Sequence, residues 1–347
     1  MSSIMRHAVA FLCTSIISIP AIAQQPSSIT VAWYGSNWGD AFRTCVAEPF
    51  TKATGITVNA EIGTSFVTLG KLQQQKASPT IDVAWMDSGL SELAMAAGVV
   101  DNLDPAKIPN MSQLLPEAIY KSGAVTYAVG TGYFSLGIAY NTAKVKAEPT
   151  SWNDLWKKEH EEAVTIPSPA NSSGVPFVLF LAKMWNVPAS DLSPTFKKIK
   201  ELKAALYFDS SGAATNAFQS GEVIIGAHFS VAAWDLIDKG LPIRFVVPKE
   251  GAWAGDARLH LVKGTRKKEA AEKFINQALT VEASACLADR LYLGPSVKGV
   301  VVKPETARKL PWGAKGSIKD LRLFDMNEVN ALRAKIVDTW NREIARR

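Results

Sequence analysis

The feature that most constrains the fold is an alternation of strand and helix patterns between residues 28 and 97. Residues 28–33 form a β-branched run, and a glycine-containing loop separates them from a helix expected to begin at Asp40 and end at Gly55. Strands expected at 56–62 and 81–85 are each followed by a helix, at 69–76 and 88–97. This order predicts an α/β fold in which helices cover both faces of a mostly parallel sheet.

The pattern shifts beyond this region. Strands are expected at 125–129 and 135–140, on either side of Gly130, Thr131 and Gly132, which we interpret as a crossover between domains. Further strands are expected at 163–166, 223–227, 243–247 and 259–262. Helices are expected at 150–156, 175–185, 193–206, 213–218, 231–239, 266–279, 281–290 and 326–344.

Residues 1–23 have the organisation of an export signal. A short basic start at Arg6 precedes an apolar run at 8–19, and Ala21 and Ala23 form the small-x-small pattern that signal peptidase cuts. We therefore predict a cleavable signal peptide, cut near Ala23, and a periplasmic or secreted protein. The 324 residues that remain (347 less 23) are too many for one ordinary core and indicate two domains.

Charge and cysteine content narrow the possible partners. The net charge of +6 is spread along the chain, whereas a nucleic-acid binder concentrates its basic residues in a patch. Cys45 and Cys286 follow the signal region, and their spacing excludes a C-x-x-C motif. In an oxidising compartment they form either one disulfide or two small buried side chains, and the sequence leaves both alternatives open.

No catalytic constellation is apparent. His160, His228 and His260 are not at metal-ligand spacing from one another, and the common nucleophile, zinc and phosphate-binding motifs are absent. We therefore expect no enzyme, no metal site and no cofactor. The alternative is a secreted hydrolase that uses Asp87 and Asp256 as an acid/base pair.

Aromatic residues and carboxylates gather near the expected strand ends. In open α/β sheets ligands bind beyond the carboxyl ends of the strands. Aromatic faces combined with carboxylates suit a positively charged amine, through cation–π contacts and charge-assisted hydrogen bonds. The residues in such positions are Trp33, Tyr34, Trp38, Trp85, Asp87, Tyr133, Trp253 and Asp256.

Several motifs occur in an order that is similar to one protein family. They are WYGSNWGD at 33–40, EPFTKATGI at 48–56, IDV at 81–83, GIAYN at 137–141, PTSWNDLW at 149–156, QSGEV at 219–223, PKEG at 248–251, KEAAEKFI at 268–275 and WNRE at 340–343. Together they resemble the extracellular solute-binding proteins of ABC importers, in the group that contains spermidine/putrescine-binding proteins.

The resemblance implies a two-lobed periplasmic-binding-protein fold of type II, with a hinged cleft. Lobe one would comprise residues 28–131 and 254–300, lobe two residues 132–253, and residues 301–347 would form helices packed on the lobes. A disulfide would then lie within lobe one. The protein would act as a monomer that hands a small amine-bearing solute, such as putrescine or spermidine, to a membrane permease.

The resemblance also implies a set of ligand-binding residues. The first loop and the loop after the third strand would contribute Trp33, Tyr34, Trp38, Trp85, Asp87 and Ser88, and later segments Tyr133, Phe229, Trp253, Asp256 and Tyr292. Of these, Asp256 matches an amine-binding carboxylate. Asp256→Ala is therefore expected to abolish ligand binding and to leave the melting temperature of the free protein nearly unchanged.

One segment departs from the polyamine pattern. The loop at 167–174 carries no carboxylate for the second amine, and Asp209 is the expected substitute. Arg258 offers a different solution, because a guanidinium binds a carboxylate or phosphonate through two hydrogen bonds. The alternative ligand is therefore a zwitterion of the γ-aminobutyrate or aminophosphonate type.

Overall fold

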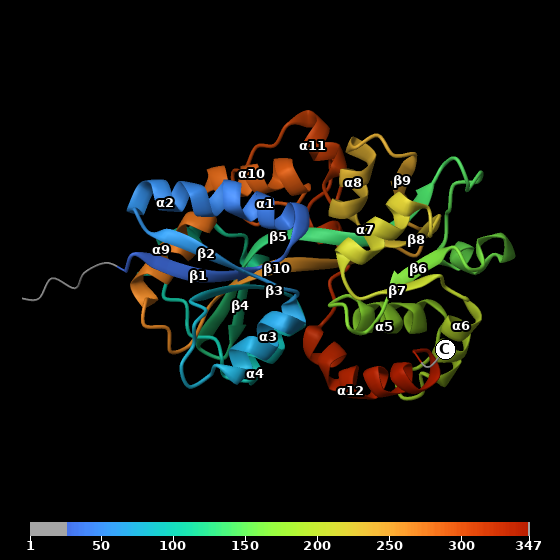
Figure 1. Cartoon of the computed structure of the whole chain (residues 1–347), viewed down its shortest axis with the longest axis horizontal. Coiled ribbons are helices and arrows are strands. Elements are labelled where there is room, and N and C mark those ends of the chain that lie inside the picture. Colours follow the sequence, from blue (N-terminus) through green and yellow to red (C-terminus); the bar gives the residue numbers. More distant parts are fainter. Residues whose placement is uncertain (1–25, 346–347) are drawn as a thin grey trace, which may run out of the picture.

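The computed structural model describes residues 26–345 of the 347-residue chain. Two groups of strands with their covering helices lie side by side, and two long strands run between them (Figure 1). The signal peptide expected at 1–23 and its cleavage site near Ala23 lie outside the described residues.

The strands and helices alternate over most of the chain. The strands are β1 (Ser28–Trp33), β2 (Thr57–Ile62), β3 (Val83–Asp87), β4 (Ile119–Ser122), β5 (Val125–Asn141), β6 (Val164–Pro167), β7 (Leu206–Phe208), β8 (Ile225–Phe229), β9 (Ile243–Val246) and β10 (Trp253–Leu261). The α-helices are α1 (Ser36–Phe42), α2 (Glu48–Thr54), α3 (Ser65–Gln74), α4 (Leu90–Ala96), α5 (Gly174–Met184), α6 (Ser193–Glu201), α7 (Ser211–Ser220), α8 (Ser230–Asp238), α9 (Lys268–Ala278), α10 (Val281–Leu291), α11 (Pro304–Lys309) and α12 (Met326–Glu343). Short 3₁₀ helices span Pro109–Gln113, Pro116–Ala118, Trp152–Trp156, Lys158–His160 and Ile318–Asp320.

The strand order explains how the two groups are joined. The first strand group, β2-β1-β3, and the second strand group, β8-β6-β7, are each parallel. The antiparallel strands β10 and β5 lie between them, β10 against β3 and β5 against β8. The α/β architecture expected from the sequence is thus present as two parallel sets connected by long antiparallel strands.

Helices cover both groups of strands. In Figure 1, α1, α2 and α10 lie on one side of β1 and β3, and α3 and α4 lie on the other. In the second strand group, α7 and α8 lie on the side away from α5, and α12 packs against α5 and α6. No helix within residues 26–345 has the length and apolar character needed to cross a membrane.

The crossover expected at residues 130–132 is part of a continuous strand. Gly130 and Gly132 lie inside β5, where the sequence had indicated a break between two shorter strands. A Cβ atom on Gly132 would lie 2.9 Å from the Cβ of Leu293. These glycines therefore allow close packing against β5, and they do not form a loop.

The first helical segment begins earlier than expected. α1 starts at Ser36 and continues through a π-helical turn, Arg43–Ala47, into α2. Pro49 lies in the first turn of α2, directly after the π-helical turn, and Gly55 ends the helix with a φ of 74°. The same π-helical turn carries Cys45, which forms a disulfide with Cys286 of α10 across a Cα–Cα distance of 5.6 Å. Of the two alternatives left open by the sequence, the structure shows the disulfide.

Candidate functional site

A cavity of about 470 Å³, here called cavity one, is lined by residues of both strand groups. The segments that follow β1 (34–38), β2 (62–66), β6 (170–172) and β7 (209–212) form most of its wall, with the ends of β3 and β8 and parts of α7 and α8. All these segments follow the carboxyl ends of parallel strands, which is where open α/β sheets bind ligands.

Asp87, the last residue of β3, is the most strongly held carboxylate of cavity one. Its Oδ1 accepts a hydrogen bond from the hydroxyl of Tyr34 at 2.8 Å. Its Oδ2 accepts one from Ser172 Oγ at 2.6 Å, and Ser172 belongs to the loop after β6 in the second strand group. The backbone N–H of Asp87 donates to Ser65 Oγ at 3.0 Å. The side chain therefore has a fixed position and contacts both sides of the cavity.

The charge of Asp87 has no counter-ion. Within residues 26–345, no lysine, arginine or histidine forms an ion pair with it. Burial raises the pKa of Asp87 above its ordinary value, although hydrogen bonds from Ser172, Tyr34 and Ser65 act in the opposite direction. Burial, followed by the charge of Asp87, also raises the pKa of the Tyr34 hydroxyl well above its usual value. Tyr34 is thus a hydrogen-bond donor at all ordinary pH values.

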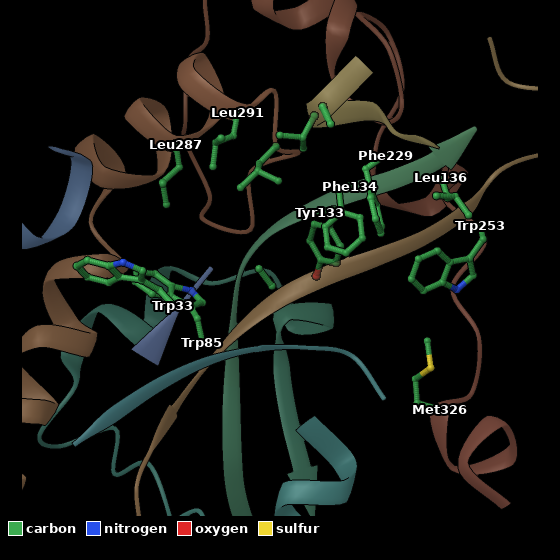
Figure 2. Packing of buried hydrophobic residues seen from close by; sticks show 14 of the residues in the cluster. Trp33, Trp85, Tyr133, Phe134, Leu136, Phe229, Trp253, Leu287, Leu291 and Met326 are labelled. Carbon is green, nitrogen blue, oxygen red and sulfur yellow. The ribbon is translucent and has the colours of Figure 1, made fainter. Parts of the chain in front are cut away.

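Four aromatic rings form a connected wall of cavity one. Tyr34 contacts Trp38 edge-on at a centroid distance of 5.3 Å, and Trp38 contacts Phe134 at 5.9 Å. Phe134 in turn contacts Phe229 at 5.5 Å, and Figure 2 shows these two rings together. Such rings offer an apolar surface and, through their faces, an attraction for cations.

The loops after β6 and β7 form a polar wall of cavity one. Asn171 donates from its side-chain amide to the backbone oxygen of Asp209 at 3.1 Å, which ties the loops after β6 and β7 together. Ser210 caps α7 by accepting from the Ala213 N–H at 3.2 Å. A Cβ on Gly212, in the first turn of α7, would lie 3.8 Å from Ser36 Oγ at the start of α1. The beginnings of two helices therefore face each other in the cavity, and helix beginnings favour negative groups.

Five of the residues predicted from the sequence line cavity one. They are Tyr34, Trp38, Asp87, Asp209 and Phe229, which come from loops or strand ends on both sides. Asp209 itself is exposed. The structure brings these residues together as the sequence had indicated, and their role in ligand binding stays a prediction.

The structure places eight other predicted residues outside the lining of cavity one. They are Trp33, Trp85, Ser88, Tyr133, Trp253, Asp256, Arg258 and Tyr292. Side chains alternate along a strand, so that Trp33 points into the core while its neighbour Tyr34 reaches the cavity. Figure 2 shows Trp33 beside Trp85, and the ring of Trp85 stacks on Phe42 at 3.7 Å.

Asp256 and Arg258 form a buried ion cluster. Arg258 donates from Nε and Nη2 to the two carboxylate oxygens of Asp256, at 2.7 and 3.1 Å, and from Nη1 to Glu92 at 2.6 Å. The guanidinium also lies 3.5 Å from the ring centre of Tyr120. Both charges are thus satisfied inside the protein, and the acid/base pair of Asp87 and Asp256 considered from the sequence does not share a cavity.

The remaining predicted residues lie in the core or at another part of the surface. Trp85 donates from Nε1 to Thr131 Oγ1 at 2.9 Å, and Tyr133 and Trp253 are fully buried along β5 and β10. The backbone N–H of Ser88 donates to the backbone oxygen of Asp256 at 3.2 Å. Tyr292 contacts Asp238 and Lys309 at the surface.

Sequence reasoning missed the small polar residues of the site. Ser172 and Ser65 contact Asp87 directly, and Ser36, Asn37 and Ser211 also line cavity one. Their position just after expected strands was the available signal. Serine and asparagine are common in all loops, so this signal does not separate a binding loop from an ordinary one.

Comparisons with known proteins identify the family and similar proteins. Residues 46–311 match the family model described as bacterial extracellular solute-binding protein. The spermidine/putrescine-binding periplasmic protein 1 of Haemophilus influenzae is 28% identical over 71% of this chain and 70% of its own length. The γ-aminobutyric acid-binding protein of Pseudomonas aeruginosa is 24% identical over 89% of each chain.

A solved structure shows the same fold. The crystal structure of an ABC transporter protein from Clostridium perfringens superposes with a TM-score of 0.71 at 27% identity, and covers 91% of this chain and 99% of its own. The two-lobed periplasmic-binding-protein fold expected from the sequence is therefore confirmed. Because the family model matches well over half of its length, the chain belongs to the bacterial extracellular solute-binding protein family.

Proposed function

We propose that this protein is the periplasmic substrate-binding component of an ABC importer, which captures a small amine-bearing solute and delivers it to a membrane permease. The family, and relatives with polyamine- and γ-aminobutyrate-binding names, support this role. Export through residues 1–23 with cleavage near Ala23, action as a monomer and the absence of catalysis are parts of the same proposal.

The observation that carries the proposal is the uncompensated charge of Asp87 in cavity one. A buried carboxylate without a cation is costly, and a ligand ammonium group supplies the missing charge. Tyr34 and Ser172 hold the two oxygens of the Asp87 carboxylate, and this fixes the direction from which an ammonium group would donate to it. The rings of Trp38, Phe134 and Phe229 would enclose the alkyl chain and add cation–π attraction of about 0.5–2 kcal/mol.

Closure of the two lobes is part of the proposed mechanism. The lobe boundaries given from the sequence place Asp87 in lobe one and Ser172 in lobe two. With these boundaries their hydrogen bond is a contact across the cleft, and it would break if the lobes moved apart. Binding of an ammonium group beside Asp87 would favour this closed arrangement, because both half-sites then contact the ligand and exclude water.

The test is titration calorimetry of the mature protein, freed of co-purified ligand, with putrescine, spermidine and γ-aminobutyrate. At least one is expected to bind, and Asp87→Asn is expected to weaken that binding about 10- to 100-fold, which corresponds to the loss of a charge-assisted hydrogen bond. Asp338→Asn, at an exposed position on α12, is the matched control. Equal affinity of wild type and Asp87→Asn would reject the site, and chemical conversion of the bound solute would reject the receptor role.

The second candidate ligand is a zwitterion of the γ-aminobutyrate type. It is favoured by the beginning of α7, where Ser211 and Gly212 line cavity one and the helix dipole favours a carboxylate. Substitution of Asp209 distinguishes putrescine from γ-aminobutyrate as the ligand. Asp209→Asn should weaken binding of putrescine, whose second ammonium needs a carboxylate, and should leave γ-aminobutyrate binding unchanged or stronger.

A further inference from the structure

A second cavity of about 410 Å³, here called cavity two, lies outside the site described above. It is lined by Ser135 of β5, Ser230 and Trp234 of α8, Phe245 of β9, and Arg308 and Trp312 of the segment that follows α10. These elements are far apart in sequence. The cavity exists because residues 308–313 pass over the edge formed by α8 and β9.

Cavity two uses the opposite faces of walls that enclose cavity one. Phe134 lines cavity one and the next residue of β5, Ser135, lines cavity two. Likewise, Phe229 lines cavity one and the next residue, Ser230, lines cavity two. Successive residues of a strand point to opposite faces, so β5 is a partition between the two cavities. The two cavities are therefore separate sites on opposite faces of β5.

The floor of cavity two carries a polar atom without a partner. Ser135 is only 2% exposed, and its Oγ has no hydrogen-bond partner within residues 26–345. The neighbouring Ser230 Oγ accepts from the backbone N–H of Ser135 at 3.2 Å, which fixes the position of the strand but leaves the Ser135 hydroxyl free. A buried hydroxyl without a partner is costly, and a polar group of a ligand would satisfy it.

The rim of cavity two carries positive charge. Arg308 is exposed, and its guanidinium forms no ion pair within the described part of the chain. The neighbouring Lys309 is held by Asp238 and lies 5.6 Å from the ring centre of Trp234. Asp320, the acidic residue of the lining, accepts from the backbone N–H of Ser317 at 2.7 Å and is committed to that cap. Arg308 is thus the charged group available to a ligand.

The walls between the floor and the rim are aromatic. Trp234 and Phe245 contact each other at a centroid distance of 6.2 Å, and Trp312 lines the same cavity. Indole and phenyl faces bind flat apolar groups by offset or edge contacts. Floor, walls and rim therefore match three different parts of one small molecule.

We propose that cavity two is a binding site for a small aromatic carboxylate. Its carboxylate pairs with Arg308, since a guanidinium binds a carboxylate through two parallel hydrogen bonds. Its ring packs between Trp234, Phe245 and Trp312, and a polar substituent at the far end of the ring hydrogen-bonds Ser135 Oγ. The proposal is independent of the amine proposed for cavity one.

The test uses 4-hydroxyphenylacetate as the probe, titrated into the mature protein and followed by calorimetry and by ligand-observed NMR. We expect saturable binding. Arg308→Gln should weaken it roughly tenfold, whereas the neutral 4-hydroxyphenylacetamide should bind wild type and Arg308→Gln equally. Ser135→Ala should weaken binding of the hydroxylated probe by about 3- to 10-fold and leave phenylacetate binding unchanged.

Two matched controls separate these effects from general destabilisation. Ser284 Oγ is also buried and unpartnered among residues 26–345, but it lies on α10 outside both cavities, so Ser284→Ala should bind the probe like wild type. Arg266 is an exposed arginine in the turn before α9, and Arg266→Gln should also bind normally. The wild-type preference for 4-hydroxyphenylacetate over phenylacetate tests the floor contact even if Ser135→Ala does not fold.

Three results would overturn the proposal. They are the absence of saturable binding at millimolar probe, binding that both Arg308→Gln and Ser135→Ala leave unchanged, and binding that Asp87→Asn abolishes while Arg308→Gln does not. The last result would place the probe in cavity one.

Discussion

Asp87 and Asp256 show how the partner of a buried carboxylate decides its role. Asp256 is neutralised by Arg258 through two hydrogen bonds, and it has no charge to offer a ligand. Asp87 is held by the neutral hydroxyls of Tyr34 and Ser172. The free protein therefore carries an unfavourable charge at the place where we propose that the ligand supplies the opposite one.

Asp87→Asn is expected to make the ligand-free protein more stable at neutral pH. Because the folded-state pKa of Asp87 is raised, its contribution to stability is fully present below the unfolded value of about 3.9 and is lost as the pH rises through the folded-state pKa. The asparagine variant does not suffer this loss. Melting temperatures measured from acidic to neutral pH should diverge in favour of the variant, by on the order of 2–4 °C for each ~1 kcal/mol. A pH-independent difference would contradict this assignment.

Because Asp256 belongs to the buried ion cluster with Arg258, Asp256→Ala is expected to lower the free energy of unfolding. Removing it leaves Arg258 buried beside Glu92 with two of its three side-chain hydrogen bonds broken, and breaking a buried pair costs about 3–5 kcal/mol. The structure therefore favours a large decrease in the free energy of unfolding, with amine affinity retained by the folded fraction. Urea denaturation and calorimetry on the same sample separate the two effects. An unchanged unfolding midpoint combined with lost binding would restore the expectation drawn from the sequence.

At the scale of elements, α12 connects parts of the protein that the strand order separates. It packs against α5 and α6 and also reaches α4 in the first strand group (Figure 1). Arg333 of α12 lies 5.5 Å from the ring centre of Phe66, is only 9% exposed, and has Nη1 and Nη2 without hydrogen-bond partners among the described residues. Burial lowers its pKa to about 10.

Arg333→Met is therefore expected to be neutral or stabilising. The methionine keeps the apolar contact with Phe66 and removes a charge that pays a desolvation cost without an ion pair in the described chain. We expect the free energy of unfolding to rise by up to ~1–2 kcal/mol, measured by urea denaturation. Lys335→Met, at an exposed position on the same helix, is the control. A loss of several kcal/mol in Arg333→Met would mean that the guanidinium has a further partner in solution, beyond Asn330 Oδ1, which accepts from its Nε at 2.8 Å.

The same scale shows what the sequence could predict. The sequence predicted β1 at its observed bounds, because a run of β-branched residues flanked by strand-breaking polar residues favours an extended conformation. β5 was divided in two because glycine normally interrupts strands, and its packing against Leu293 comes from a segment more than 150 residues away. β7 was not expected, because its three residues carry little periodic signal, and only Leu206 fell within the helix expected at 193–206.

The site was predictable in part. The carboxyl ends of β1 and β3 indicated Tyr34, Trp38 and Asp87, and all three line cavity one. Asp256 and Arg258 lie two residues apart on one strand and therefore share a face, which was a sign of mutual pairing. Glu92, the third member of the cluster, is brought there by tertiary structure and leaves no local signal.

For the whole molecule, the Cys45–Cys286 disulfide joins residues 241 positions apart. It fastens the turn between α1 and α2 to α10, so the first strand group and its helices include both early and late parts of the chain. Closing so long a loop restricts the unfolded chain strongly in the entropic model of disulfide stabilisation.

Replacing both cysteines by alanine is expected to lower the free energy of unfolding by about 2–4 kcal/mol. Cavity one should keep its shape, because neither cysteine lines it. Amine affinity at low temperature should therefore stay close to that of wild type. Urea denaturation of the double variant, compared with the oxidised and reduced wild type, measures the effect. Equal midpoints for all three proteins would show that the bond contributes nothing to stability.

The position of β10 between β3 and β5 has a consequence for the order of folding. A nascent chain that ends before residue 253 holds β3 and β5 but lacks the strand that separates them. The edges of β3 and β5 that β10 covers in the native sheet are then exposed, and they either pair with the wrong strand or stay unpaired. The native strand order of the N-terminal half therefore cannot be completed until residues 253–261 have been synthesised.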